Sequence, residues 1–166
     1  MGVRETNRSP SLPASTDGRE CFADFYRRER ADSLRVARLL TGSRVGAEDV
    51  VQDAMTGVFR AYERIESPSA YLRRAVVNTA KSRQRDERRQ RERAVHAQRS
   101  ATGNDSDVEL LEAIAELPYR QRVVIVARYW GGWSEQEIAA ALECRPGTVK
   151  SLASRALNRL RSEVQT

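Results

Sequence analysis

The stretch from Pro146 to Arg161, PGTVKSLASRALNRLR, constrains the fold most, because its apolar residues recur with the period of an α-helix. One face gathers apolar side chains, at Val149, Ala153, Ala156, Leu157 and Leu160. The opposite face carries small, polar and basic side chains, at Lys150, Ser151, Ser154, Arg155 and Asn158. Pro146 suits the first helical position, since its missing N–H would have no partner there anyway. The pattern predicts an amphipathic helix with a basic outer face.

A shorter helix is predicted just upstream, where Ser134 and Glu137 have the spacing of a capping box ahead of Ile138 and Leu142. Two short helices joined by a tight turn, the second with a small, polar and basic outer face, fit the major groove of DNA. An ordinary terminal hairpin with a solvated face would explain the apolar stripe equally well. It explains less well why no acidic residue occurs between Lys150 and Arg161.

Composition favours an all-α fold and an anionic partner. Hydrophobic residues make up 40% of the chain, charged residues 31% and aromatic residues 6%, and strand-like alternation is rare. The net charge of +6 and the pI near 9.9 favour nucleic acid or a membrane surface as partner. No apolar run approaches the roughly 20 residues that span a bilayer. The N-terminus lacks the apolar core of a signal peptide, so we expect a cytoplasmic protein.

The sequence predicts neither a metal site nor a cofactor. Cys21 and Cys144 lie far apart without a CxxC motif, and His96 is the sole histidine, which argues against a zinc site and a disulfide framework. No GxxxxGK[ST] loop is present, and we expect no enzymatic activity.

Changes in pattern divide the chain into two small helical domains joined by a flexible linker. Residues 1–17 are predicted to be a disordered arm, 18–93 a helical domain, 94–106 the linker, and 107–163 a helical domain that contains the helix-turn-helix. In the first domain we expect helices over 18–40 and 46–65 and a third that begins after Ser67-Pro68.

The helix predicted over 46–65 carries an acidic cluster with three interpretations. Glu48, Asp49 and Asp53 could complement the positive end of the helix, bind a metal for nuclease chemistry, or dock a basic partner. The apolar stripe of the same helix contains Val51, Met55, Val58 and Tyr62, widened by Val50, Ala54 and Phe59.

The third helix changes character along its length. Its start carries apolar residues such as Leu72 and Val76, whereas arginines dominate beyond Asn78. Such a charge run is usually a solvated helix end. The arginine excess on a helix whose base is packed also suggests a ridge that follows phosphates.

Three stretches, in this order and spacing, resemble the extracytoplasmic-function type of bacterial RNA polymerase sigma factor, the short form with regions two and four only. They are AEDVVQDAM (47–55), SAYLRRAVVNTAKSRQRDERR (69–89) and LPYRQRVVIVARYWGGWSEQEIAAALECRPGTVKSLASRALNRLR (117–161). The resemblance implies a non-enzymatic protein that binds core RNA polymerase, recognises the −35 and −10 promoter elements and helps to melt DNA. Relatives are commonly held inactive by an anti-sigma factor, so such a partner is a candidate here too.

The resemblance also implies roles for particular residues. The surface that grips the clamp helices of the largest polymerase subunit would comprise Glu48, Asp49, Gln52, Asp53 and Met55. Contacts to the −10 element would come from Tyr71, Arg74, Asn78, Lys81 and Arg85, although Tyr71 could equally be a core residue. Contacts to the −35 element would come from Lys150, Ser151, Ser154, Arg155, Arg145 and Thr148, with Arg120 and Arg122 as further backbone contacts at best. The C-terminal domain would also bind the flap of the second-largest subunit.

The sequence departs from the family pattern at three positions near the helix-turn-helix. Leu152 stands where many relatives have an arginine, and by its place on the helix it could pack instead. Arg145 occupies a position that usually caps the helix, and Glu143 a turn position where glycine is common. These departures bear on which promoter is read.

Two other protein classes compete with this prediction. A stand-alone regulator would use its helix-turn-helix as a dimer on palindromic DNA. A membrane-surface protein would lay the basic helix on lipid, although the apolar face of that helix is narrow for this purpose.

Overall fold

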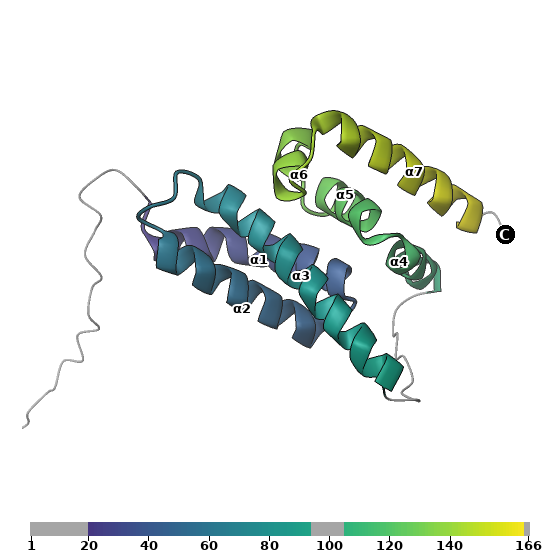
Figure 1. Ribbon diagram of the computed structural model, residues 1–166, viewed down its shortest axis with the longest axis horizontal. Coiled ribbons are helices and arrows are strands. Elements are labelled where there is room, and N and C mark those ends of the chain that lie inside the picture. Colours follow the sequence, from purple (N-terminus) through teal and green to yellow (C-terminus); the bar gives the residue numbers. More distant parts are fainter. Residues whose placement is uncertain (1–19, 94–104, 165–166) are drawn as a thin grey trace, which may run out of the picture.

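The computed structural model describes residues 20–93 and 105–164, and within these ranges every regular element is an α-helix. The helices form two units in chain order (Figure 1). The N-terminal unit holds α1 (Phe22–Thr41), α2 (Arg44–Ala61) and α3 (Pro68–Arg93). The C-terminal unit holds α4 (Asp105–Glu116), α5 (Tyr119–Tyr129), α6 (Glu135–Ala141) and α7 (Pro146–Val164). The prediction of an all-α fold with two helical domains is confirmed.

The structure bears on only part of the predicted domain boundaries. The predicted arm, 1–17, and residues 94–104 of the predicted linker lie outside the described residues. Asp105 and Ser106, which were predicted to end the linker, instead form the first turn of α4.

In the N-terminal unit, α1 to α3 pack against one another around apolar side chains. The largest fully buried ones are Phe25, Val36, Leu40, Val50, Val58, Leu72 and Val76. Helix α1 ends at Gly42, which has a φ of 69° and whose N–H donates to the Arg38 carbonyl at 2.8 Å. This left-handed conformation suits glycine, so the predicted stop at Thr41-Gly42 is confirmed.

Helix α2 begins two residues earlier than the sequence predicts, at Arg44 instead of Gly46. The Ser43 hydroxyl caps it by accepting from the Gly46 N–H at 3.2 Å. The first turn therefore contains no acidic residue. The interpretation that Glu48, Asp49 and Asp53 complement the positive end of this helix is wrong, because these acids lie beyond its first turn.

Helix α3 continues without a break through the arginine-rich stretch as far as Arg93. Pro68 occupies its first position, and the Ser67 hydroxyl accepts from the Ala70 N–H at 3.4 Å. Among the α3 side chains that the structure describes, Ala80 is the last fully buried one.

The C-terminal unit contains the predicted helix-turn-helix in α6 and α7. The capping box is present: Glu137 N–H donates to Ser134 Oγ at 3.2 Å, and Ser134 N–H donates to Glu137 Oε2 at 2.7 Å. The apolar stripe of α7 packs inward, with Val149, Ala153, Ala156 and Leu160 buried. This confirms the amphipathic helix predicted for 146–161.

The two units also pack directly on each other, mainly α3 against α6 and α1 against α5. In Figure 1 the C-terminal unit lies along the N-terminal bundle, with α6 next to the first half of α3. The buried apolar side chains form one cluster that includes residues of both units. The linker is therefore not the only connection between the units.

Candidate nucleic-acid and polymerase interfaces

The outer face of α7 carries the side chains that were predicted to contact the −35 element. All six are exposed: Arg145, Thr148, Lys150, Ser151, Ser154 and Arg155. The N–H of Thr148 donates to the Arg145 carbonyl at 2.9 Å, which places Arg145 directly before the first turn of α7. Leu152 is half-buried and packs against the core. The leucine that stands where many relatives have an arginine is therefore a packing residue.

Two of these side chains have local partners. Lys150 Nζ lies 3.7 Å from Glu135 Oε1 at the start of α6, and the Ser151 hydroxyl donates to the Gly147 carbonyl at 3.1 Å. Both Lys150 and Arg155 remain exposed. An exposed ion pair contributes little energy, so a phosphate or a base edge can compete with Glu135 for Lys150.

A second exposed stripe runs along α3. Its members recur at intervals of three and four residues, so they share one helix face: Tyr71, Arg74, Asn78, Lys81 and Arg85. Tyr71 is 41% exposed and its ring lies over α2, where a Cβ added to Gly57 would be 3.6 Å from it. The alternative that Tyr71 is a core residue is therefore wrong. The stripe offers one aromatic ring and several cations, the groups that hold unpaired nucleic acid.

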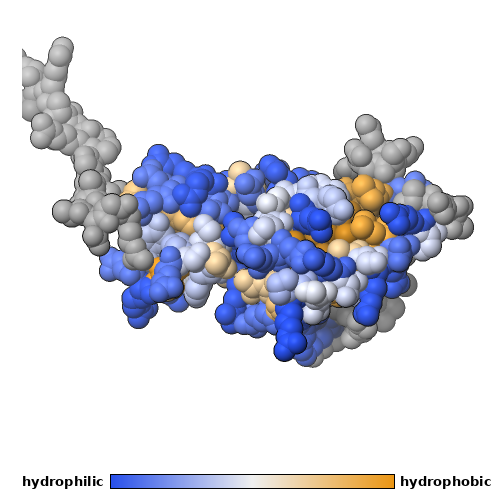
Figure 2. All heavy atoms as spheres, turned by 90° about the horizontal axis from the view of Figure 1, so that it is seen from above, coloured by the Kyte–Doolittle hydropathy of each residue, from blue (hydrophilic) through white to orange (hydrophobic). Residues whose placement is uncertain are grey.

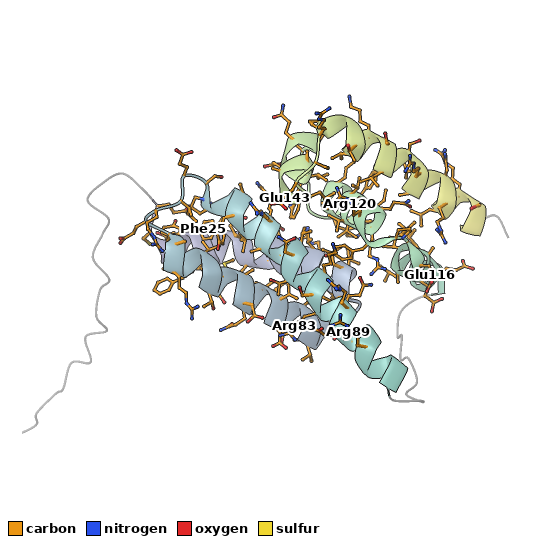
Figure 3. All side chains as sticks on the ribbon, in the orientation of Figure 1. Phe25, Arg83, Arg89, Glu116, Arg120 and Glu143 are labelled. Atoms are coloured by element: carbon orange, nitrogen blue, oxygen red, sulfur yellow. The ribbon has the colours of Figure 1, made fainter. Side chains whose placement is uncertain are left out.

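The N-terminal part of this stripe, around Arg74, faces the helix-turn-helix. The Arg74 guanidinium is ion-paired with Glu143, in the turn between α6 and α7. One residue earlier on α3, Arg73 Nη1 lies 2.8 Å from Glu137 Oε1 and its guanidinium stacks 5.7 Å from the centre of the Trp133 ring. Figure 3 labels Glu143 at the edge of α6 next to α3.

The acidic face of α2 is exposed at Glu48, Asp49, Gln52 and Asp53, but the acids are not isolated. Arg83 of α3 bridges two of them, at 2.8 Å from Asp49 and 3.6 Å from Asp53. Glu48 pairs with Arg44 one turn earlier at 3.3 Å. Arg83 projects from α3 towards α2 in Figure 3.

Met55 does not belong to this surface. Its side chain is 3% exposed and lies in the core, so the prediction that it contacts the polymerase is wrong. Phe59, by contrast, was predicted to widen the apolar stripe and is 63% exposed. It lies edge-on to Phe22, with ring centres 5.0 Å apart. The sequence contained a signal for this exposure, because Phe59 follows the polar Gln52 by seven residues, which places both on one helix face.

Arg122 is buried between the units, so its assignment as a DNA-backbone contact is wrong. It is 6% exposed, donates to the Leu40 carbonyl of α1 at 3.2 Å, and donates to the Leu117 carbonyl at the end of α4 at 3.1 Å. With the Gln84 amide turned so that its oxygen faces Arg122, that oxygen accepts from Nη1 at 2.8 Å. Burial lowers the pKa of the Arg122 guanidinium from its usual value. Arg122 therefore joins the ends of two helices from different units.

Tyr119 makes a further polar contact between the units. Its hydroxyl donates to the Val77 carbonyl of α3 at 2.6 Å, and burial raises the pKa of that hydroxyl well above its usual range. A carbonyl inside a helix is already bonded to its own helix, so sequence alone gives no indication that it accepts from a distant tyrosine.

Neither metal ligands nor a membrane-spanning helix occur in the part of the chain that the structure describes. Residues 20–93 and 105–164 contain no group of three or more His, Cys, Asp or Glu that could hold a metal ion. Among the same residues no helix has the length and apolarity to cross a membrane. Figure 2 shows one face of the molecule, on which hydrophilic residues predominate over scattered apolar patches. Instead of forming a metal site, Glu48, Asp49 and Asp53 of α2 pair with arginines.

Fold and surfaces together define a class: a helical protein of two units that presents a helix-turn-helix and a second basic helix. Comparison with known proteins specifies the family. Residues 25–90 match the family model described as Sigma-70 region 2, and residues 107–160 match the one described as Sigma-70, region 4. The chain belongs to the sigma-70 family of RNA polymerase sigma factors, in its extracytoplasmic-function group.

Individual relatives match over most of the chain. The RNA polymerase sigma-E factor of Streptomyces coelicolor is 36% identical over 151 residues, covering 86% of this chain and 85% of that protein. The ECF RNA polymerase sigma factor SigM of Mycobacterium tuberculosis is 30% identical over 167 residues, covering 96% of this chain and 85% of that protein. Among solved structures, the sigma factor RpoE in complex with the anti-sigma factor NepR from Bartonella quintana superposes with a TM-score of 0.67 at 27% identity, covering 86% of this chain and 98% of that one.

Family membership decides between the competing functions. The chain is a sigma factor, with core RNA polymerase and promoter DNA as its partners, and not a stand-alone dimeric regulator. Sigma factors are initiation factors that act through binding.

Proposed function

We propose that this sigma factor reads a promoter with two separate surfaces, α7 on the duplex −35 element and the α3 stripe on the unpaired −10 element. The observation that supports this most directly is that two exposed basic faces lie on different units of one chain. Neither face alone specifies a promoter. Core polymerase sets the distance between them, so that only DNA with both elements at the correct spacing is bound strongly.

At the −35 element, Lys150 and Arg155 reach base edges or adjacent phosphates from the exposed face of α7. Ser151 and Ser154 lie on the same face and are short enough to let the helix approach the groove closely. Arg145 and Thr148, at the start of α7, bind backbone phosphates, where the helix N-terminus also favours an anion. The base contacts give specificity and the phosphate contacts fix the register.

At the −10 element, Tyr71 stacks on an unpaired base while Arg74, Lys81 and Arg85 hold phosphates of the same strand. Asn78 lies between them on the stripe and can hydrogen-bond a base edge. Stacking on an aromatic side chain contributes roughly 1–3 kcal/mol per base. That energy offsets the cost of unpairing, so melting needs no nucleotide hydrolysis by the sigma factor, and we expect no enzymatic activity.

The polymerase clamp docks on the acidic face of α2. Glu48, Gln52 and the Asp49–Asp53 pair are exposed along it, and the aromatic ring of Phe59 extends the same face. A basic partner can draw Asp49 and Asp53 away from Arg83, because ion pairs at the surface are weak. The C-terminal unit binds the polymerase flap. The protein then acts in the cytoplasm, and an anti-sigma factor is an expected partner, since the similar RpoE was solved in complex with the anti-sigma factor NepR.

Footprinting tests the two-surface proposal. With core polymerase on a promoter, we expect an asymmetric footprint and unpaired, permanganate-reactive thymines in its downstream part only. Arg155→Ala should weaken protection upstream, and Tyr71→Ala should reduce downstream reactivity. A symmetric footprint formed without polymerase would contradict the proposal.

A further inference from the structure

The segment that joins α2 to α3, residues 63–67, leads directly into the stripe proposed to hold the −10 strand. Four of its side chains are exposed: Glu63, Arg64, Glu66 and Ser67. The side chain of Ile65 packs against the core instead. Tyr71, the first residue of the stripe, donates its N–H to the Ser67 carbonyl at 3.0 Å. The position of the Tyr71 ring therefore depends on how this segment leads the chain into the first turn of α3.

A partly buried carboxylate of α1 holds the start of α3. The Ser69 hydroxyl, at the second position of α3, donates to Glu29 Oε1 at 2.7 Å. The Glu29 side chain is 17% exposed, and its Oε1 also lies 3.2 Å from Arg28 Nη2. A hydroxyl that donates to an ionised carboxylate makes one of the stronger hydrogen bonds in a protein. Glu29 therefore fixes where α3 begins relative to α1.

The other end of the segment is tied to the same part of α1. Tyr62, the C-cap residue of α2, donates its hydroxyl to the Glu20 carbonyl at 3.0 Å. The Glu20 carboxylate pairs with Arg28, the arginine that also pairs with Glu29. Figure 1 shows the α2–α3 connection and the start of α1 at the same end of the N-terminal unit. These contacts form one continuous network, the Glu29 network, which runs from Tyr62 through Glu20, Arg28 and Glu29 to Ser69.

Stability alone does not account for an acid at the position of Glu29. Taking a carboxylate partly out of water costs free energy even when it is paired, and an apolar side chain of similar volume often stabilises a protein at least as well. The core of the N-terminal unit is already made by apolar side chains such as Phe25 and Leu72. What Glu29 adds is direction, because a satisfied polar network fixes the positions of its members more closely than apolar contact does.

We propose that Glu29 is a positioning residue for the −10 element. Through Ser69 it fixes the first turn of α3, and through Arg28 it joins the two ends of segment 63–67, so that this segment and the Tyr71 ring are ordered for one unpaired base. The inference rests on the proposed role of Tyr71 in stacking. Glu29 acts through Ser69 and contacts no DNA. A site that is ordered beforehand binds more tightly, because little ordering remains when the strand arrives.

The proposal is tested with holoenzyme assembled from core polymerase and the full-length protein. The DNA is a pool of fork junctions, random in both the duplex part and the single-stranded part, and sequencing of the bound fraction gives the base preference at each position. Glu29→Leu removes the acceptor and keeps a similar volume, Ser69→Ala removes the donor, and Glu29→Gln keeps an amide oxygen that accepts from Ser69. Asp32→Leu is the matched control, since Asp32 lies one turn further along α1, is exposed and pairs with Arg35 of the same helix.

Glu29→Leu and Ser69→Ala should each weaken binding of the selected single strand by about 3- to 10-fold, the effect of losing one hydrogen bond, and should flatten its base preference. The preference in the duplex part should stay as in the wild type, which a general loss of structure would not allow. Glu29→Gln should restore most of the affinity, and the double variant should bind no more weakly than either single one. A Glu29→Leu holoenzyme with the affinity and base preference of Asp32→Leu would overturn the proposal. If Glu29→Leu does not fold, Ser69→Ala decides in the same way.

Amide hydrogen exchange of the free protein separates failure of this inference from failure of the proposed function. Residues 63–71 should exchange faster in Glu29→Leu than in Asp32→Leu, because the Glu29 network orders them without DNA. If the wild-type holoenzyme selects a single-stranded sequence and Glu29→Leu selects it equally well, the positioning role is wrong and promoter reading stands. If the wild type selects no single-stranded sequence, the proposed function fails, and faster exchange in Glu29→Leu then shows an ordering role without a −10 role.

Discussion

The two helices proposed to contact DNA, α7 and α3, differ in how the free chain presents them. The outer face of α7 is exposed at Lys150, Ser151, Ser154 and Arg155, and Lys150 pairs with Glu135 of the same unit. The corresponding face of α3 begins under the C-terminal unit, where Arg74 meets Glu143. The surface proposed to read duplex DNA is therefore accessible in the free chain, whereas the surface proposed to hold the open strand is partly covered by the other unit.

The largest effect is expected from removing the buried arginine that joins the units. Arg122→Ala leaves the Leu40 and Leu117 carbonyls without their shared donor, which should lower the free energy of unfolding by about 2–3 kcal/mol. Denaturant unfolding measures this. Arg120→Ala, two residues earlier and exposed, should stay within about 0.5 kcal/mol. Equal stability of the two variants would mean that Arg122 does not hold the units together.

The next effect concerns the exposed face of α7. Lys150→Ala combined with Arg155→Ala should reduce promoter use by about 10- to 100-fold, since each base or phosphate contact contributes roughly 1–3 kcal/mol. Affinity for core polymerase, measured by anisotropy, should stay unchanged. Arg161→Ala, an exposed arginine in the last turn of α7, serves as the control that also loses a positive charge. Promoter use at the wild-type level would contradict the proposal that α7 contacts the −35 element.

A comparable test applies to the acidic face of α2. Asp49→Lys with Asp53→Lys places positive charge where a basic clamp would dock and beside Arg83, so core affinity should fall about tenfold or more. Binding of duplex DNA by the isolated sigma factor should not fall. Glu112→Lys on α4 controls for the change in net charge. Retained core affinity in the double variant would contradict the docking assignment.

The smallest effect is a pH dependence that arises at Glu137. Hydrogen bonding to the Ser134 backbone lowers the pKa of Glu137, with a smaller contribution from Arg73. A lowered pKa in the folded state means stabilisation that is complete above the ordinary value of 4.5 and is lost as the pH falls through the depressed value. Glu137→Gln keeps a capping side chain but has no charge. Its unfolding free energy should fall less steeply below pH 4.5 than that of the wild type, and equal slopes would contradict this origin.

Sequence reasoning predicted the features that depend on local pattern. The apolar stripe of α7, the Ser134–Glu137 capping box and the stop at Gly42 follow from helical periodicity and from the chemistry of helix ends, which neighbouring residues determine. The stripe on α3 was assigned by the family resemblance, and the spacing of its residues by three and four positions places them on one helix face.

The errors arose where contacts between distant parts of the chain decide which side chains are buried. Periodicity placed both Met55 and Phe59 on the apolar side of α2, and Met55 is buried there whereas Phe59, at the edge of that side, is 63% exposed. The family resemblance, not the periodicity, assigned Met55 to the polymerase surface. Arg122 looks like a surface cation in sequence, and only the meeting of α1 and α4 ends provides carbonyls that allow its burial. The contact between Arg74 and Glu143 joins residues distant in the chain, for which a single sequence carries no signal.

The most direct test of the two-surface account is transcription from genomic fragments by purified core polymerase with and without this protein. We expect the protein to add transcripts whose start sites share one upstream duplex motif and one downstream motif at constant spacing. Arg74→Ala should reduce their number through the downstream element, and Arg155→Ala through the upstream one. A core enzyme shown to be active that yields no additional start sites in the presence of the protein would contradict the account.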